Sequence, residues 1–276
     1  MTDRYAVIGH PISHTQSPQI HALFAAATGQ DMAYTAIEGR LGAFADDVAA
    51  FRRTGGLGMN VTVPFKLDAL ACATECSDRA HLSGAANALK FEGDKILADN
   101  FDGVGLTRDV THNLRFPLAG QRVLILGAGG ATRGMVLPFL AQHPQCLVIT
   151  DLTLDPAQAV ANEVAAHGVT DCSVTACTYD TLAGQFDRVF NATSASLFGQ
   201  LPPITANVFA PGCLAYELVY GKGLTPFLAL AQQSGAGTLA DGVGMLVEQA
   251  AEAFEWWRGV RPATAQVIQQ LKVPLF

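Results

Sequence analysis

The sequence has no hydrophobic run long enough to cross a bilayer, which takes about 20 residues, and it is poor in charge. Charged residues make up 15% of the 276 residues, Lys and Arg never form a cluster, and the formal net charge is -7. This balance argues against nucleic acid and anionic membranes as partners. The chain enters a strand-like segment directly after Arg4, so we expect no export signal and a cytoplasmic location.

Cysteine and histidine are present but follow no metal-binding pattern. The six cysteines form no C-x-x-C motif and no Cys/His spacing typical of zinc, and the seven histidines are scattered. We therefore expect reduced, buried thiols and no bound metal.

Half of the residues are apolar, and the length suffices for two domains with substantial cores. Strands are expected at 5–9, 33–37 and 58–63, with helices between them, and a hairpin at 86–100. A second series of apolar strands follows at 123–126, 147–150, 173–175, 188–191 and 214–220. Two helices, 242–258 and 263–271, end the chain. This order predicts an α/β protein whose first layer is separate from the second.

The strand at 123–126 leads into a glycine-rich turn that is typical of dinucleotide binding. The turn reads Gly127-Ala128-Gly129-Gly130-Ala131-Thr132, and a helical pattern and a second strand ending at Asp151 follow it. Glycines at 127 and 129 let the backbone approach a pyrophosphate at the helix N-terminus. The third glycine of the motif is replaced by Thr132, and an ordinary strand-to-helix turn that needs glycine is the alternative interpretation.

The acid at 151 favours NAD over NADP. It can accept hydrogen bonds from a free ribose, whereas it would repel a 2′-phosphate. No Lys or Arg occurs between Arg133 and Arg188 to bind that phosphate, although Arg133 itself remains a possible partner. A helix cap or turn residue is the alternative role for Asp151.

Lys66 and Asp102 each follow an expected strand and stand at a helix start. Taken separately, a surface lysine and a helix N-cap are the ordinary interpretations. Taken as a pair they suit proton transfer, because a carboxylate holds a partly desolvated lysine in place beside a reacting hydroxyl.

Around these residues the chain resembles the shikimate dehydrogenase family over nearly its whole length. The segments that carry the resemblance are 5–18, Asn60-Val61-Thr62-Val63-Pro64-Phe65-Lys66, Gly84-Ala85-Ala86-Asn87, Asp99-Asn100-Phe101-Asp102-Gly103, 127–131, Asn191-Ala192-Thr193-Ser194, 220–226 and 240–249. The resemblance implies an α/β substrate-binding domain, 1–103 plus 239–276, completed by C-terminal helices. It implies a Rossmann-type domain at 104–238.

The resemblance also implies an oxidoreductase that interconverts 3-dehydroshikimate and shikimate with NAD, NADP being possible. Lys66 and Asp102 would be catalytic. The expected substrate contacts are Thr15, Ser17, Thr62, Asn87, Phe101, Tyr220 and Gln249. The expected cofactor contacts are Gly127, Ala128, Gly129, Gly130, Ala131, Asp151, Asn191, Thr193 and Gly244.

Three positions depart from the family pattern. Thr15 replaces serine, Phe101 replaces threonine, and Asp151-Leu152 replaces the Asn-Arg of NADP-using members. Because Phe101 adds a ring near the expected substrate, an NAD-dependent quinate dehydrogenase is an alternative. A non-catalytic binding protein on the same fold, with Phe101 closing the pocket, is a further alternative, although Lys66, Asp102, Asn87 and Gln249 are all retained. We expect a monomer or a homodimer.

Overall fold

A computed structural model describes residues 2–168 and 172–275, and the chain divides into two compact units. The first unit comprises Met1–Gly105 with Val247–Gln270, and the second comprises Leu106–Leu246 with Leu271–Phe276. The chain therefore passes between the units inside α5 (Asp102–Arg108) and α9 (Val243–Arg258), and again at the last residue of α10 (Ala265–Leu271). The domain limits expected from the resemblance, 1–103 with 239–276 and 104–238, stay a prediction.

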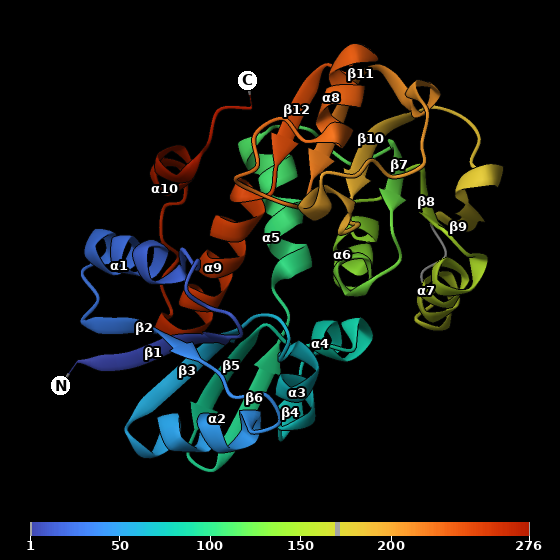
Figure 1. The fold of residues 1–276 in the computed structure, drawn as a ribbon. Coiled ribbons are helices and arrows are strands. Elements are labelled where there is room, and N and C mark those ends of the chain that lie inside the picture. The colour runs from blue at the N-terminus through green and yellow to red at the C-terminus, as the bar shows by residue number, and fades with distance from the viewer. Residues whose placement is uncertain (1, 169–171, 276) are drawn as a thin grey trace. The chain divides into compact units, whose positions relative to one another are not determined.

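The first unit is built on a six-stranded mixed sheet in the order β2-β1-β3-β5-β6-β4 (Figure 1). Its strands are β1 (Asp3–Gly9), β2 (Met32–Glu38), β3 (Gly56–Val61), β4 (Glu75–Cys76), β5 (Ala88–Glu92) and β6 (Lys95–Asp99). Strand β1 pairs in parallel with β2 and β3, whereas β5 runs antiparallel to both β3 and β6. The helices of this unit are α1 (Ser17–Thr28), α2 (Phe44–Arg53), α3 (Lys66–Ala71), α4 (Asp78–Ser83), most of α9, and α10 (Ala265–Leu271).

The C-terminal helix α9 packs directly on this N-terminal sheet. The indole nitrogen of Trp257 donates to the Leu89 carbonyl at 3.0 Å, across the β3–β5 pair. Gly58 of β3 permits this approach, because a Cβ there would lie 2.6 Å from the same indole nitrogen. The ring of Trp257 also stacks on Tyr5 of β1. The last long helix thus completes the core of the first unit, as the sequence predicted.

The second unit holds a six-stranded, wholly parallel sheet in the order β12-β11-β10-β7-β8-β9. Its strands are β7 (Arg122–Leu126), β8 (Cys146–Asp151), β9 (Ser173–Thr178), β10 (Phe186–Asn191), β11 (Phe209–Glu217) and β12 (Thr238–Asp241). Its α-helices are α6 (Gly130–Leu140), α7 (Leu154–Ala166) and α8 (Pro226–Gln233). Its shorter helices are a π-helical turn at Asp109–Asn113 and 3-10 turns at Tyr179–Thr181, Ala195–Phe198 and Ala206–Val208.

The strand order reverses between β7 and β10, and a doubly wound sheet binds its ligand at such a point, beyond the carboxyl ends of the strands. The two-domain α/β architecture predicted from the sequence is confirmed. The short elements β4, α4, α8 and β12 were not expected. Strand β12, for example, has four residues between glycine-containing turns, which leaves no periodic pattern to detect.

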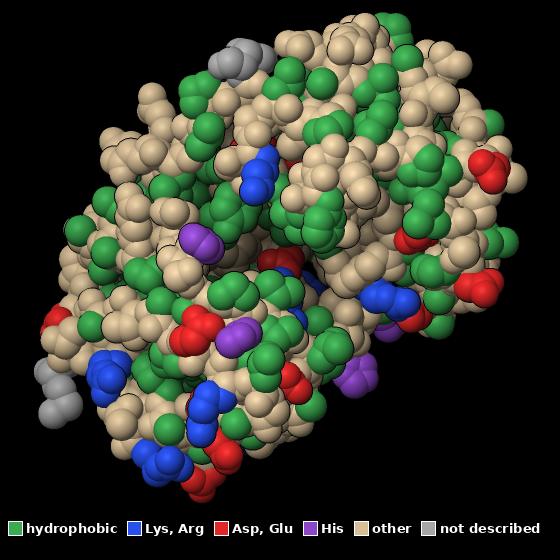
Figure 2. Space-filling model, viewed as in Figure 1, with side chains coloured by type: hydrophobic (Ala, Val, Ile, Leu, Met, Phe, Trp, Pro, Cys, Tyr) green, Lys and Arg blue, Asp and Glu red, His purple; other side chains and the backbone are tan. Residues whose placement is uncertain are grey.

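No helix among residues 2–168 and 172–275 is long and apolar enough to cross a membrane. On the face drawn in Figure 2, Lys and Arg side chains are interspersed with acidic ones and do not gather into a continuous basic patch.

Candidate active site

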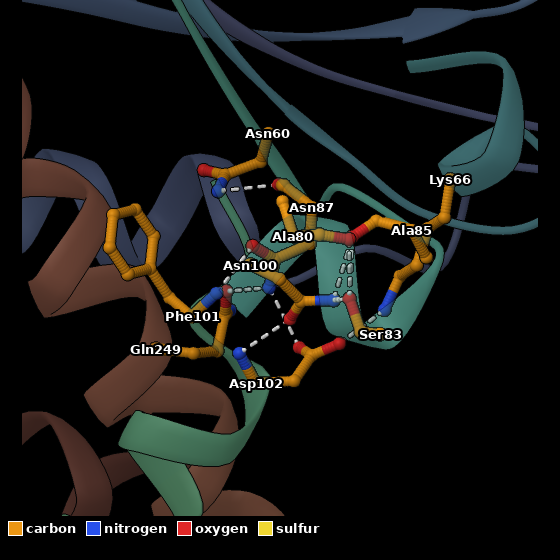
Figure 3. Close-up of polar contacts among 10 residues, drawn as sticks. All are labelled: Asn60, Lys66, Ala80, Ser83, Ala85, Asn87, Asn100, Phe101, Asp102 and Gln249. Carbon is orange, nitrogen blue, oxygen red and sulfur yellow. Dashed lines mark hydrogen bonds and ion pairs between the residues drawn. The ribbon is translucent and has the colours of Figure 1, made fainter. Parts of the chain in front are cut away.

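Lys66 and Asp102 form an ion pair in the first unit. The ammonium of Lys66, at the first residue of α3, lies 2.6 Å from Oδ2 of Asp102, the first residue of α5. Thirty-six residues separate them in sequence, and Figure 3 shows their side chains approaching from different elements. The Asp102 side chain is 16% exposed and that of Lys66 31%, so the pair is partly shielded but still reachable.

The second carboxylate oxygen of Asp102 is held by a buried amide. Nδ2 of Asn87 donates to Asp102 Oδ1 at 2.8 Å and also approaches Gln249 Oε1 at 3.4 Å. Gln249 comes from α9, so the C-terminal helix contributes a polar group to the site. The structure therefore brings together four of the residues expected to act on substrate (Figure 3). Two charged groups and two amides in one place can bind hydroxyls and transfer a proton.

The loop that follows β1 carries two neighbouring hydroxyls. The Thr15 hydroxyl donates to Ser17 Oγ at 3.1 Å and accepts the Ser17 N–H at 3.3 Å, immediately before α1. Thr62 follows β3, the parallel neighbour of β1, and its N–H donates to the Ile8 carbonyl. Three of the expected substrate contacts thus follow the carboxyl ends of two adjacent strands, and their contact with substrate stays a prediction.

The ring of Phe101 does not lie beside the ion pair. It is 4% exposed, stands edge-on to Trp256 of α9, and has the Arg79 guanidinium over its face. Figure 3 shows it pointing away from Asp102. The backbone N–H of Phe101 is what reaches the site, because it donates to Asn87 Oδ1 at 2.9 Å. The idea that this ring closes the pocket is therefore not supported. The added ring fills the interface between β6 and α9 instead.

The glycine turn of the second unit has the geometry expected for a dinucleotide. Gly127 follows β7 with a φ of 92°, in the region that favours glycine, and its Cα faces Thr193, which follows β10. A Cβ on Gly129 or Gly130 would meet no described heavy atom within 4 Å, so the backbone before α6 is open to a ligand. Helix α6 begins at Gly130 without any side-chain cap, which leaves its first N–H groups available to an anion.

Asp151 ends β8 and is tied to this turn. Its Oδ2 accepts the N–H of Ala128 at 2.7 Å, and its Oδ1 accepts that of Leu152 at 2.6 Å. Arg133, the remaining candidate for a 2′-phosphate, is paired with both carboxylate oxygens of Glu163. The carboxylate therefore stands beside the turn, and the nearest cation in sequence is already neutralised.

Asn191 is held by a buried acid, Glu217, that sequence reasoning missed, and Thr193 in turn donates to Asn191 Oδ1. Oε2 of Glu217 accepts from Asn191 Nδ2 at 2.9 Å and from the hydroxyls of Ser196 and Thr225. Burial raises the pKa of the Glu217 carboxyl, and the hydrogen bonds from these three side chains and from the Val219 N–H oppose that shift. The signal available in the sequence was an acid directly after an apolar strand, in the position Asp151 has after β8.

Gly244, the expected nicotinamide contact, has a packing reason to be glycine. A Cβ there would lie 2.0 Å from Oδ1 of the buried Asp109 carboxylate. The other oxygen of Asp109 accepts a hydrogen bond from the Tyr216 hydroxyl at 2.8 Å, and that hydroxyl in turn accepts the Met245 N–H at 3.3 Å.

Two further expected site residues also lie in the second unit. Ala131 stands in the first turn of α6, and Tyr220 is 41% exposed in the loop after β11.

The described residues contain no group of three or more His, Cys, Asp or Glu side chains placed to hold a metal ion. All six cysteines are free thiols. Only Cys172 and Cys213 are buried as the sequence suggested, whereas Cys76 is exposed and the other three are partly exposed. Desolvation raises the pKa of the Cys213 thiol to about 11, which keeps it protonated.

Comparison with known proteins finds two family models that match segments of this chain. Residues 7–89 match the model of a shikimate dehydrogenase substrate binding domain, and residues 242–272 match a shikimate 5'-dehydrogenase C-terminal domain. The chain is 53% identical over 271 residues to a shikimate dehydrogenase (NADP(+)) of Aromatoleum aromaticum, covering 98% of this chain and 97% of that protein. It is 52% identical to the protein of the same name from Chromobacterium violaceum, covering 99% and 98%.

Solved structures show the same architecture. An Ael1 enzyme from Pseudomonas putida superimposes with a TM-score of 0.95 at 56% identity, covering 100% of both chains. Shikimate 5-dehydrogenase from Thermus thermophilus, solved with NADP(H) and shikimate, gives a TM-score of 0.84 at 27% identity, covering 97% and 98%. That of Listeria monocytogenes, solved with shikimate and NAD, gives 0.86 at 24% identity, covering 98% and 96%, and shows the shared fold.

Proposed function

The chain belongs to the shikimate dehydrogenase family, and we propose that it interconverts 3-dehydroshikimate and shikimate with a nicotinamide cofactor. The observation that supports this most directly is the 2.6 Å ion pair between Lys66 and Asp102, with Asn87 and Gln249 beside it. A binding protein without catalysis has no need of such a pair. The expected cytoplasmic location and the choice between monomer and homodimer stay predictions.

In this proposal Lys66 handles the proton of the reacting oxygen. During reduction the ketone oxygen takes a proton from the Lys66 ammonium and becomes the hydroxyl, and during oxidation Lys66 takes that proton back. Asp102 holds the ammonium in place, while Asn87 keeps the carboxylate from turning away. The cofactor, when bound, would supply or accept the hydride at the carbon that carries this oxygen.

The second unit supplies the groups that would hold the dinucleotide. The open backbone at Gly129 and Gly130 and the uncapped start of α6 suit the pyrophosphate, and Asp151 suits the adenosine ribose. The hydroxyl groups of Thr15, Ser17, Thr62 and Tyr220 would bind the carboxylate end of the substrate.

The proton-transfer role is tested by Lys66→Ala. We expect kcat with shikimate to fall by roughly 10²- to 10⁴-fold, while the dissociation constant of the dinucleotide, measured by calorimetry, is unchanged. Lys95→Ala is the matched control, because Lys95 forms an exposed ion pair with Glu75 on the same sheet. A Lys66→Ala variant that turned over at the wild-type rate would contradict the mechanism.

We further propose that NAD is preferred, because the Asp151 carboxylate would repel a 2′-phosphate and no Lys or Arg occurs between Arg133 and Arg188. The curated relatives are named for NADP(+), which makes this the point where the chain would differ from them. The experiment is the initial rate with shikimate and with quinate, each with NAD and with NADP. Comparable kcat/KM for the two dinucleotides would contradict the preference. Activity mainly on quinate would favour the alternative substrate.

A further inference from the structure

Asn100 stands where the two segments that carry the site residues are joined. It follows β6 directly, is 4% exposed, and precedes Asp102 by two residues. On its other side lies the segment 83–87, which leads from the end of α4 to Asn87 (Figure 3). The same segment contacts the backbone of Lys66, because the Ala86 N–H donates to the Lys66 carbonyl at 2.9 Å.

The two ends of the Asn100 amide have different partners. Its oxygen accepts the Asp102 N–H at 3.1 Å, the geometry of an Asx-turn. Its nitrogen donates to Ser83 Oγ at 3.0 Å and to the Ala85 carbonyl at 3.1 Å. One side chain thus fastens the backbone of Asp102 to the loop before Asn87, and every hydrogen-bonding atom of the amide is used.

These contacts set the position of Asp102 relative to its partners. The carboxylate must reach Lys66 with one oxygen and Asn87 with the other, and those two residues are connected to the 83–87 segment. We propose that Asn100 is the positioning residue that holds the Lys66–Asp102 pair in its productive geometry. The inference rests on the proposed function, since it concerns the same reaction.

An aspartate at this position provides a specific test, because its shape is that of asparagine. When neutral, its carboxyl can donate to the Ala85 carbonyl and accept from Asp102. When ionised, it has no donor and faces the Ala85 oxygen. The charged groups around it are Asp99, which pairs with Arg79 and accepts the Asn100 N–H at 2.7 Å, and Asp102, which pairs with Lys66. The segment 83–87 contributes none.

Burial and two neighbouring carboxylates would raise the pKa of that introduced acid above the ordinary aspartate value of about 4. We therefore expect the kcat of Asn100→Asp, divided by the wild-type kcat, to approach one at pH 6 and to fall about ten- to a hundred-fold by pH 9. The dissociation constant of the dinucleotide, measured in parallel, stays unchanged. Asn100→Ala, which cannot be rescued by protonation, shows the low kcat at every pH.

Asn162→Asp is the matched control, because it adds the same charge on the exposed face of α7 and keeps a flat kcat ratio. A ratio for Asn100→Asp that does not change with pH overturns the inference, as does an Asn100→Ala variant within twofold of wild type. So does loss of folding, seen by circular dichroism, in both variants at every pH. Wild-type turnover of shikimate is measured first, and its absence would refute the proposed function and this inference with it.

Discussion

His21 makes the stability of the first unit depend on pH in a way that can be calculated. Its ring is fully buried on α1, stacks on Tyr34 with centroids 4.0 Å apart, and is surrounded by Phe24, Phe254 and Trp257. Neither ring nitrogen has a hydrogen-bond partner among the described residues. Desolvation therefore lowers the pKa of His21 from 6.5 to about 3, with the nearby Asn60 amide opposing a small part of the shift.

The sign follows from proton binding in the two states. Between pH 6.5 and about 3 the imidazole is protonated in the unfolded chain and neutral in the folded one. The unfolded state therefore binds more protons, and the free energy of unfolding falls as the pH falls through this window. At 1.36 kcal/mol per pH unit, the contribution is about 1.4 kcal/mol lost at pH 5.5 and about 2.7 kcal/mol lost at pH 4.5.

The perturbation is His21→Phe, which keeps an aromatic ring and removes the titration. Urea unfolding is followed by tryptophan fluorescence at pH 7.5, 5.5 and 4.5. Both tryptophans of the chain, Trp256 and Trp257, lie in the first unit, so the signal reports the unit that contains His21. We expect wild type to lose about 2.7 kcal/mol relative to the variant between pH 7.5 and 4.5. Parallel pH dependences would refute the reasoning, whatever the offset between the two proteins.

Two further predictions concern the second unit. Glu217→Gln places an amide N–H against donors such as Asn191 Nδ2. We expect the free energy of unfolding to fall by roughly 1–3 kcal/mol and the dinucleotide to bind more weakly. An unchanged melting temperature would contradict this. Gly244→Ala forces a Cβ into the Asp109 carboxylate, and we expect this overpacking to lower the free energy of unfolding by about 1–3 kcal/mol. The control is Gly130→Ala, where a Cβ meets no described atom within 4 Å. Equal melting temperatures of the two variants would argue against the packing role of Gly244.

Local sequence patterns predicted much of the fold. The apolar run 123–126, the glycine turn and Asp151 follow one another within about thirty residues, the size of a βαβ unit, and their order predicts the parallel sheet that is observed. The hairpin at 86–100 was also predicted, with Gly93 in the positive-φ turn between β5 and β6. These features depend on neighbours in the chain, so the sequence expresses them directly.

The family resemblance predicted which residues form the site, but it did not predict where their side chains point. Lys66 and Asp102 were paired as a hypothesis about chemistry, and the structure places their charged atoms 2.6 Å apart. Phe101 was expected near the substrate because of its place in the motif, whereas its ring packs on Trp256, a residue far along the chain. A motif specifies which backbone position is used, while packing against α9 decides where the ring goes.

The sequence by itself therefore determined the α/β class, the glycine turn between β7 and α6, and the family. Only the tertiary structure decided that Asn100 joins the segments of Asn87 and Asp102, that His21 is buried in an aromatic cluster, and that Gly244 faces Asp109. The physical reason is that hydrogen bonding, desolvation and close packing are set by atoms in segments distant in sequence. Those neighbours exist only once the two sheets and their covering helices have formed.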